Sequence, residues 1–412
     1  MIFSNKNAYY INKILTVIFF VIICFIAVYS FIFVPEYKTY QISDWMINYQ
    51  GGFVRRGLIG QILLLANHIH IYNFRYAVLI IELIFYVLLF FFTFKIFYKY
   101  NWSLLGAMFL IACSTTSIAV YRRDFMMLCL CYFTYKNFFK YIKNNNNTAL
   151  ILSLVIMLIS IIIYEPVFFV MVPILILQYW NKNKNIIKTF SVFSIPLLGI
   201  ILSCIYNGTK EQADIIWQSW LPYITQSGDF LNGNIGEAVR FLGLNNSEVL
   251  KMHFEINLGN DALLRITTLI IVFCLAFFLC THIPSVNDKN KILECNKQKN
   301  ELSKIVIFQL LIQLPLFIGL SCDYGRTIPM SIYTSFFLFH FSNEKGIKLN
   351  VTNIINKVSD KIMNIFNSHS IFSNAWVYIV LILVFPFHTF IPSLINDNII
   401  IHSLDKIFKY IL

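Results

Sequence analysis

Residues 14–34 read ILTVIFFVIICFIAVYSFIFV, an apolar run without a charged side chain. At a rise of about 1.5 Å per residue, a helix of this length crosses the roughly 30 Å hydrocarbon core of a bilayer. Lys6 and Lys13 precede the run, and no small-residue cleavage pattern follows it. We therefore expect a retained first transmembrane helix and not a removed signal peptide.

The whole chain shares the apolar character of this first run. Of its 412 residues, 58% are hydrophobic and 13% are charged, and the mean hydropathy is +0.69. Soluble domains carry about 45–50% apolar and about 25% charged residues. The composition excludes a soluble enzyme, a disordered chain and a small disulfide-stapled domain. We expect an all-α, polytopic integral membrane protein in which residues 1–412 form a single membrane domain.

Ten further apolar runs are candidate membrane spans. They lie at 76–98, 102–120, 125–141, 148–164, 166–180, 189–206, 264–284, 305–320, 327–341 and 375–393. The resulting topology has about eleven transmembrane helices, a cytoplasmic N-terminus and a C-terminus outside. In this topology 19 Lys lie in inner segments and five lie in outer segments. That asymmetry agrees with the positive-inside rule.

Two segments test the number of crossings. Residues 57–74 are apolar but short, and we expect a re-entrant or interfacial helix within the first extracytoplasmic loop, 35–75. Residues 148–180 could form one long tilted helix, but Pro166 lies at their centre and proline prefers the first turn of a helix. We therefore predict two short helices that meet at the outer surface. The one long extracytoplasmic loop is 207–262.

The net charge of +12 does not indicate a nucleic-acid partner, because the basic residues are scattered in short loops between apolar runs. Nine cysteines are present, without a CxxC pair or a Cys/His cluster of zinc spacing. We expect neither a structural metal site, nor a disulfide framework, nor a cofactor. The abundance of Lys, Asn, Ile, Phe and Tyr is typical of an AT-rich coding sequence and suggests a bacterial source. We expect a multi-pass protein of the bacterial inner (cytoplasmic) membrane.

All eight arginines lie on the outer side in this topology, opposite to the lysines. They are Arg55, Arg56, Arg75, Arg122, Arg123, Arg240, Arg265 and Arg326. Positive charge on the outer side, which the positive-inside rule disfavours, indicates a functional role for these arginines. Arginine is well suited to phosphate because its planar fork donates two parallel hydrogen bonds.

Four short outer segments, far apart in the sequence, concentrate charged residues on one membrane face. The candidate substrate-binding residues are Gly51, Gly52, Arg55, Arg56, Arg122, Arg123 and Arg326, and the candidate bases are Glu165, Asp44 and Asp323. The two glycines allow a sharp turn and close approach of the backbone to a ligand. Single pairs, such as Arg123 with Asp124 or Asp323 with Arg326, could instead be structural ion pairs.

Other polar and aromatic features are weaker signals. Glu82, inside a span, is expected to be paired or protonated. Trp217 and Trp220 share a helical face, which suits a sugar-stacking platform, although an interfacial aromatic belt is favoured. Residues 349–366 and 398–412 have the pattern of amphipathic surface helices.

A site on the outer face has no access to cytoplasmic nucleotide sugars or ATP. The simplest substrate that needs several arginines and is reached from the lipid is a polyprenyl-pyrophosphate-linked oligosaccharide. The arginines would hold the pyrophosphate and stabilise the leaving charge, and a carboxylate would deprotonate the acceptor hydroxyl. Metal dependence of the reaction stays open, since arginine can replace a cation at a diphosphate. Glu165 and Asp44 are the leading candidates for this base, followed by Asp323. We expect burial to raise the pKa of Glu165 and Arg122 or Arg123 to lower it.

The strings GGFVRRGL at 51–58 and DYGR at 323–326, together with the length and the number of spans, resemble bacterial O-antigen polymerases of the Wzy type. More broadly the chain is similar to membrane glycosyltransferases of the GT-C class. The resemblance implies transfer of a glycan from undecaprenyl pyrophosphate during lipopolysaccharide biosynthesis, with a chain-length regulator as a possible partner. Asp44 matches, by position, the catalytic Asp in the first outer loop of GT-C enzymes.

One departure from the family concerns the loops. Wzy proteins commonly show two large outer loops, whereas this chain shows one, which leaves polymerase and single-sugar transferase open. A flippase for the lipid-linked repeat unit is the runner-up, although clustered charges and the lack of an internal repeat disfavour transport. An O-antigen ligase is the third alternative, and the sequence does not separate it from a polymerase.

Overall fold

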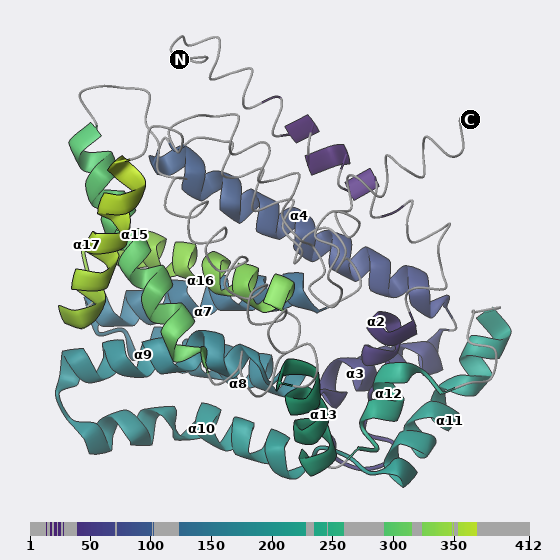
Figure 1. Ribbon diagram of the computed structural model, residues 1–412. Coiled ribbons are helices and arrows are strands. Elements are labelled where there is room, and N and C mark those ends of the chain that lie inside the picture. Colours follow the sequence, from purple (N-terminus) through teal and green to yellow (C-terminus); the bar gives the residue numbers. More distant parts are fainter. Residues whose placement is uncertain are drawn as a thin grey trace. The chain divides into compact units, whose positions relative to one another are not determined.

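The computed structural model describes residues 39–70, 72–100, 102, 123–227, 235–244, 246–258, 292–314, 324–347, 349 and 353–368, and nine positions between 14 and 28 (Figure 1). Within these ranges every regular element is a helix, which confirms the predicted all-α class. The predicted spans 264–284 and 375–393, nearly all of 102–120 and the tail 398–412 lie outside the described residues.

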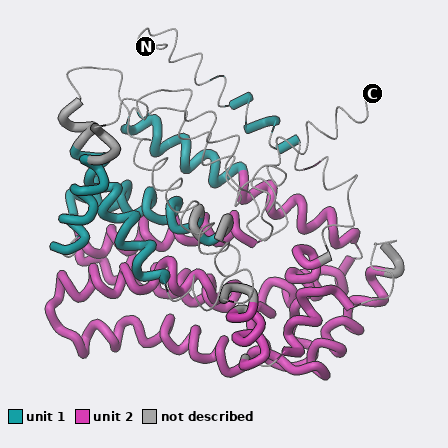
Figure 2. Tube along the Cα trace, in the orientation of Figure 1, with its two compact units in different colours: residues 1–27, 87–118, 256–412 teal, residues 28–86, 119–255 magenta. Residues whose placement is uncertain are grey.

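The chain divides into two compact units (Figure 2). One comprises residues 28–86 and 119–255, and we call it the site unit because it holds Asp44, Arg55, Arg56, Arg123 and Glu165. The other, which we call the second unit, comprises residues 1–27, 87–118 and 256–412.

The site unit begins with short helices and continues into a layered helical bundle. Its elements are α2 (Thr39–Asp44), α3 (Gly57–Ile69), the first part of α4 (Phe74–Tyr100), α7 (Asp124–Asn144), α8 (Asn147–Ile163), α9 (Val167–Asn183), α10 (Ile186–Ile205), α11 (Lys210–Ser227), α12 (Glu237–Phe241) and most of α13 (Asn246–Leu258). Helix α8 packs against α7, α9 and α10, and α9 also contacts α7 and α10 (Figure 1). Short connections make consecutive helices neighbours.

Local sequence explains where the helices of this bundle begin and end. The side chains of Asn146 and Asn185 cap α8 and α10 by accepting hydrogen bonds from the backbone N–H three residues on. Pro166 precedes α9, and α8 ends at Ile163. The prediction of two short helices within 148–180 is therefore confirmed, because proline lacks the N–H that an uninterrupted helix would use.

The described part of the predicted long loop 207–262 forms the helices α11, α12 and α13. Trp217 and Trp220 of α11 are 4% and 0% exposed, and the Trp220 Nε1 donates to the carbonyl of Met46 at 2.7 Å. Both tryptophans therefore pack inside the protein. Neither the sugar-stacking platform nor the interfacial belt suggested for them is correct, because α11 folds back onto the segment that follows α2.

The second unit contains α15 (Ile292–Ile312), α16 (Tyr324–Lys345) and α17 (Asn353–Ser368) in its described part, with α15 packed against both others. Helix α15 begins 13 residues before the predicted span 305–320, within a segment expected to be an inner loop. This Lys-rich segment was predicted to be a loop, but lysine is a good helix former, so a high lysine content does not exclude a helix. Helix α17 confirms the helix predicted over 349–366.

Two described helices, α4 and α10, are long and apolar enough to cross a membrane. On α4, Ile80, Ile84, Val87 and Phe91 are all more than half exposed. Their spacing places them on one helical face, which makes that face an apolar stripe. Helices α3 and α8 are apolar but shorter. The number of crossings and the orientation remain predictions.

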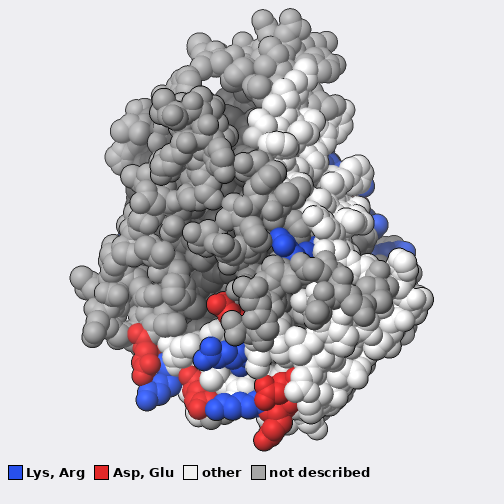
Figure 3. Space-filling view, turned by 90° about the vertical axis from the view of Figure 1, so that its right-hand side faces the viewer, with Lys and Arg blue, Asp and Glu red and all other residues white. Residues whose placement is uncertain are grey.

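Exposed charged side chains lie on α11 and α12 of the site unit. Figure 3 shows acidic and basic side chains close together near the lower edge of one face. Helices α11 and α12 of the site unit carry the exposed residues Lys210, Glu211, Asp214, Glu237 and Arg240. The exposed residues of α11 and α12 are thus far more polar than those of α4.

Candidate functional site

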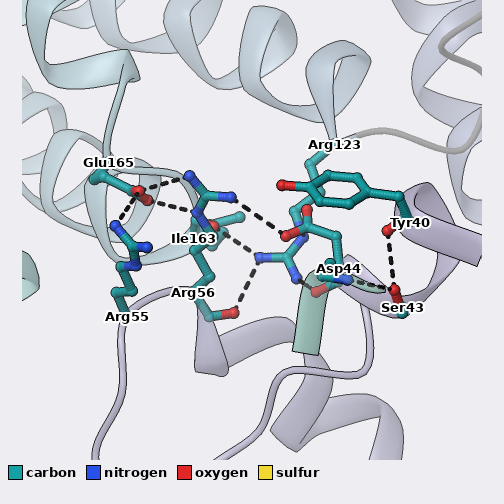
Figure 4. Close-up of polar contacts among 9 residues, drawn as sticks. Tyr40, Ser43, Asp44, Arg55, Arg56, Arg123, Ile163 and Glu165 are labelled. Atoms are coloured by element: carbon teal, nitrogen blue, oxygen red, sulfur yellow. Dashed lines mark hydrogen bonds and ion pairs between the residues drawn. The ribbon is translucent and has the colours of Figure 1, made fainter. Parts of the chain in front are cut away.

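Five charged side chains from four separate segments of the site unit meet in one cluster (Figure 4). They are Asp44 at the end of α2, Arg55 and Arg56 in the loop before α3, Arg123 at the start of α7, and Glu165 between α8 and α9. We call this set the arginine–carboxylate cluster. All five were candidate site residues on sequence grounds, and the fold brings them together.

Arg56 and Glu165 form the closest pair in the cluster. The Nε of Arg56 donates to Glu165 Oε2 at 2.8 Å, and Nη2 donates to Oε1 at 2.6 Å, so both carboxylate oxygens are held. The third guanidinium nitrogen, Nη1, lies 3.5 Å from Asp44 Oδ1. The Nη1 of Arg55 lies 3.5 Å from Glu165 Oε1. Glu165 is therefore a bidentate partner for one arginine and a looser partner for a second.

Arg123 joins three segments of backbone. Its Nη1 donates to the carbonyls of Arg56 at 3.0 Å and Ile163 at 2.8 Å, and Nη2 donates to the carbonyl of Asp44. Its Nε lies 3.3 Å from Asp44 Oδ2, and its guanidinium lies over the Trp45 ring. The side chain is fully buried. Arg123 therefore holds the cluster together and has no exposed surface for a ligand.

Contacts with α11 and α12 fix the segment that carries Asp44. The Ser43 hydroxyl accepts from the N–H of Ala238 at 3.0 Å and donates to the carbonyl of Tyr40 at 3.1 Å. The Asn48 side chain donates to Ser219 Oγ at 2.9 Å. Asp44 thus lies on a segment tied to the helices of the predicted outer loop, which restricts its movement relative to the arginines.

The glycines of the GGFVRRGL string have structural contacts of their own. Gly52 has a φ of +103°, a conformation that favours glycine. A Cβ on Gly51 would lie 2.9 Å from the carbonyl oxygen of Gln212, and a Cβ on Gly57 would lie 2.3 Å from the Tyr49 ring. The backbone at Gly51 and Gly57 therefore approaches α11 and the Tyr49 ring closely. The sequence had suggested that this backbone approaches a ligand instead.

The charges of the cluster shift one another's protonation. Burial alone would raise the pKa of Glu165, but the charge and hydrogen bonds of Arg56, with Arg55, lower this pKa to about 2. Burial opposes the charge of Arg56, yet Glu165 and Asp44 raise its pKa well above the ordinary value. Burial lowers the pKa of Arg123. The arginines that lower the pKa of Glu165 are therefore Arg56 and Arg55. The sequence had suggested that Arg122 or Arg123 would do so.

The remaining predicted site residues do not enter this description. Arg122 and Asp323 lie outside the described residues. Arg326 lies on α16, in the second unit, and its side chain is not described. Glu82 is fully buried on α4, and neither of its oxygens has a hydrogen bond within the described part of the chain.

Sequence reasoning overlooked three aromatic residues beside the cluster. Tyr49 and Phe53 lie in or next to the GGFVRRGL string, and Tyr206 follows α10. An aromatic side chain two residues from an arginine pair was the available signal.

No protein-family model matches the chain, and neither a curated protein nor a solved structure matches it.

Proposed function

We propose that the protein transfers a glycan from a polyprenyl pyrophosphate carrier to an acceptor at the extracytoplasmic face of a bacterial inner membrane, as an O-antigen polymerase does. The observation that carries the proposal is the convergence of three arginines and two carboxylates from four distant segments. A structural ion pair needs two residues, whereas this cluster keeps an excess of one positive charge. An excess of positive charge suits an anionic substrate.

Arg55 is best placed to bind the pyrophosphate. Its side chain is 20% exposed, the largest value in the cluster, although its Nε is buried. Glu165 contacts it only at 3.5 Å. Arg55 therefore has donor capacity left for phosphate oxygens, whereas Arg56 is held by Glu165 and Arg123 is buried.

Asp44 fits the role of general base better than Glu165. Both oxygens of Glu165 are held by Arg56, and its pKa of about 2 makes it a weak proton acceptor. Asp44 contacts its arginines at the longer distances of 3.5 and 3.3 Å, so its carboxylate, although buried in the cluster, is held less tightly than that of Glu165. We therefore assign Asp44 as the base and Glu165 as the residue that positions Arg56. Asp323 remains a candidate.

The proposed reaction is a single displacement. Asp44 accepts the proton of the acceptor hydroxyl while the oxygen of that hydroxyl bonds to the anomeric carbon of the donor sugar. The bond between that carbon and the pyrophosphate oxygen breaks, and the pyrophosphate carrier leaves with the electron pair. Arg55 stabilises the charge that develops on the leaving group. One displacement inverts the anomeric centre.

The test is complementation of a deletion strain, read from its lipopolysaccharide ladder. We expect the deletion to retain one repeat unit and lose the ladder, and the parent gene to restore it. Asp44→Asn should not restore the ladder, whereas Asp214→Asn, an exposed aspartate on α11, should restore it fully. Loss of every repeat unit in the deletion strain would favour a flippase or ligase, and an active Asp44→Asn variant would remove Asp44 as the base.

A further inference from the structure

An aromatic surface lies directly beside the arginine–carboxylate cluster. The rings of Tyr49 and Phe53 stack with centroids 5.3 Å apart, and the ring of Tyr206 meets Phe53 edge-on, also at 5.3 Å. Phe53 is 43% exposed and Tyr206 is 46% exposed, in contrast to the buried Trp217 and Trp220. We call these three residues the aromatic platform.

Backbone and side-chain contacts connect the platform to the arginines. The N–H of Arg55 donates to the carbonyl of Tyr206 at 2.8 Å, and Phe53 precedes Arg55 by two residues. The Tyr49 ring packs against Gly57, the residue after Arg56. The platform and the candidate pyrophosphate site therefore belong to one local structure.

We propose that the aromatic platform binds the sugar ring joined to the pyrophosphate, an inference that rests on the proposed function. In such a substrate the first sugar is bonded directly to the diphosphate, so a site that holds the diphosphate on Arg55 places this sugar within a few ångströms. The C–H groups on one face of a sugar ring are attracted to the negative face of an aromatic ring.

The surroundings of the platform suit a sugar better than an isoprenoid tail. The platform exposes the residue Tyr206, whose ring carries a hydroxyl, and Gln50 beside Tyr49 is exposed. The Gln212 side chain donates to the carbonyl of Gly51 at 3.1 Å, which keeps a further amide near Phe53. Polar groups beside an aromatic face match the hydroxyls and ring faces of a sugar. Stacking by Tyr49 also holds Phe53 in place, so the Phe53 side chain loses little conformational entropy when a ligand binds.

The test measures the binding of two probes to the full-length protein in lipid nanodiscs. One probe is the water-soluble oligosaccharide released by mild acid from the host's lipid-linked repeat units, and the other is undecaprenyl pyrophosphate without sugar. We expect Phe53→Ala to weaken oligosaccharide binding by about tenfold or more and to leave undecaprenyl pyrophosphate binding unchanged. Phe53→Trp, which keeps an aromatic face, should retain oligosaccharide binding.

Two controls make the result decisive. Phe53→Leu keeps an apolar side chain without the aromatic face, so it should behave as Phe53→Ala does even if alanine disturbs folding. Tyr98→Ala removes another exposed aromatic residue, on α4, and should bind both probes as the parent does.

Unchanged oligosaccharide binding by Phe53→Ala and Phe53→Leu would overturn the platform alone. An equal loss of undecaprenyl pyrophosphate binding would assign these residues to the lipid and also overturn it. A parent protein that binds neither probe would overturn the proposed function together with the platform.

Discussion

Replacement of Glu165 by glutamine separates the two roles that a carboxylate in this cluster can have. Glutamine keeps the shape of the side chain but loses its charge and one of its two acceptor oxygens. Arg56, whose side chain is 18% exposed, then loses the bidentate partner that holds it at 2.8 and 2.6 Å. If Glu165 positions Arg56, the change weakens the folded protein itself.

The size of the effect follows from the pKa of Glu165. Its pKa falls from an ordinary value of 4.5 to about 2 in the folded protein, and each unit corresponds to about 1.4 kcal/mol, so ionised Glu165, with the cost of its burial included, stabilises the folded protein by about 3 kcal/mol at neutral pH. Because the folded-state pKa is depressed, this stabilisation is fully present above pH 4.5. It is lost as the pH falls towards about 2.

The assay is thermal unfolding of the purified protein in detergent at a series of pH values from 7 to 3. We expect Glu165→Gln to unfold at a lower temperature than the parent at pH 7, and the gap to narrow below pH 4.5. Glu211→Gln, an exposed glutamate on α11, serves as the matched control and should unfold with the parent throughout.

Two results would refute this reasoning. Equal unfolding temperatures of Glu165→Gln and the parent at pH 7 would show that the pairing contributes little to stability. An equal difference in unfolding temperature between the variant and the parent at pH 7 and pH 3 would show that the negative charge of Glu165 is not the source of the stabilisation. A variant that is stable but inactive would return the role of general base to Glu165.

Two further predictions concern the architecture around the cluster. Arg123→Lys should destabilise the protein by about 3–5 kcal/mol, because one ammonium group cannot reach three carbonyls and Asp44 from the same buried position, and chemical unfolding in detergent measures the loss. The predicted orientation places α11 outside and the end of α7 inside, so an impermeant thiol reagent applied to intact spheroplasts should label Glu211→Cys but label Lys143→Cys only after lysis. The reverse pattern would invert the topology and place the cluster on the cytoplasmic side.

Several structural features could be predicted from local sequence because they depend on short-range chemistry. The absence of a proline N–H at Pro166 separates α8 from α9, and the apolar run 76–98 forms the long helix α4. The candidate residues of the cluster were recognisable as charges kept in otherwise apolar surroundings. The five that meet come from segments that the predicted topology placed on one membrane face.

Only the tertiary structure decided which of these charges pair. Arg56 and Glu165 are 109 residues apart, and Arg123 and Asp44 are 79 apart. Local pattern carries no information on such distances, because the choice of partner depends on how α2, α3, α7 and the α8–α9 junction pack. The same packing buried Trp217 and Trp220, left Phe53 and Tyr206 exposed, and held both oxygens of Glu165. The sequence by itself determined the all-α class, the apolar helices such as α4 and α8, and the charged candidate residues, whereas long-range packing decided the roles of those residues.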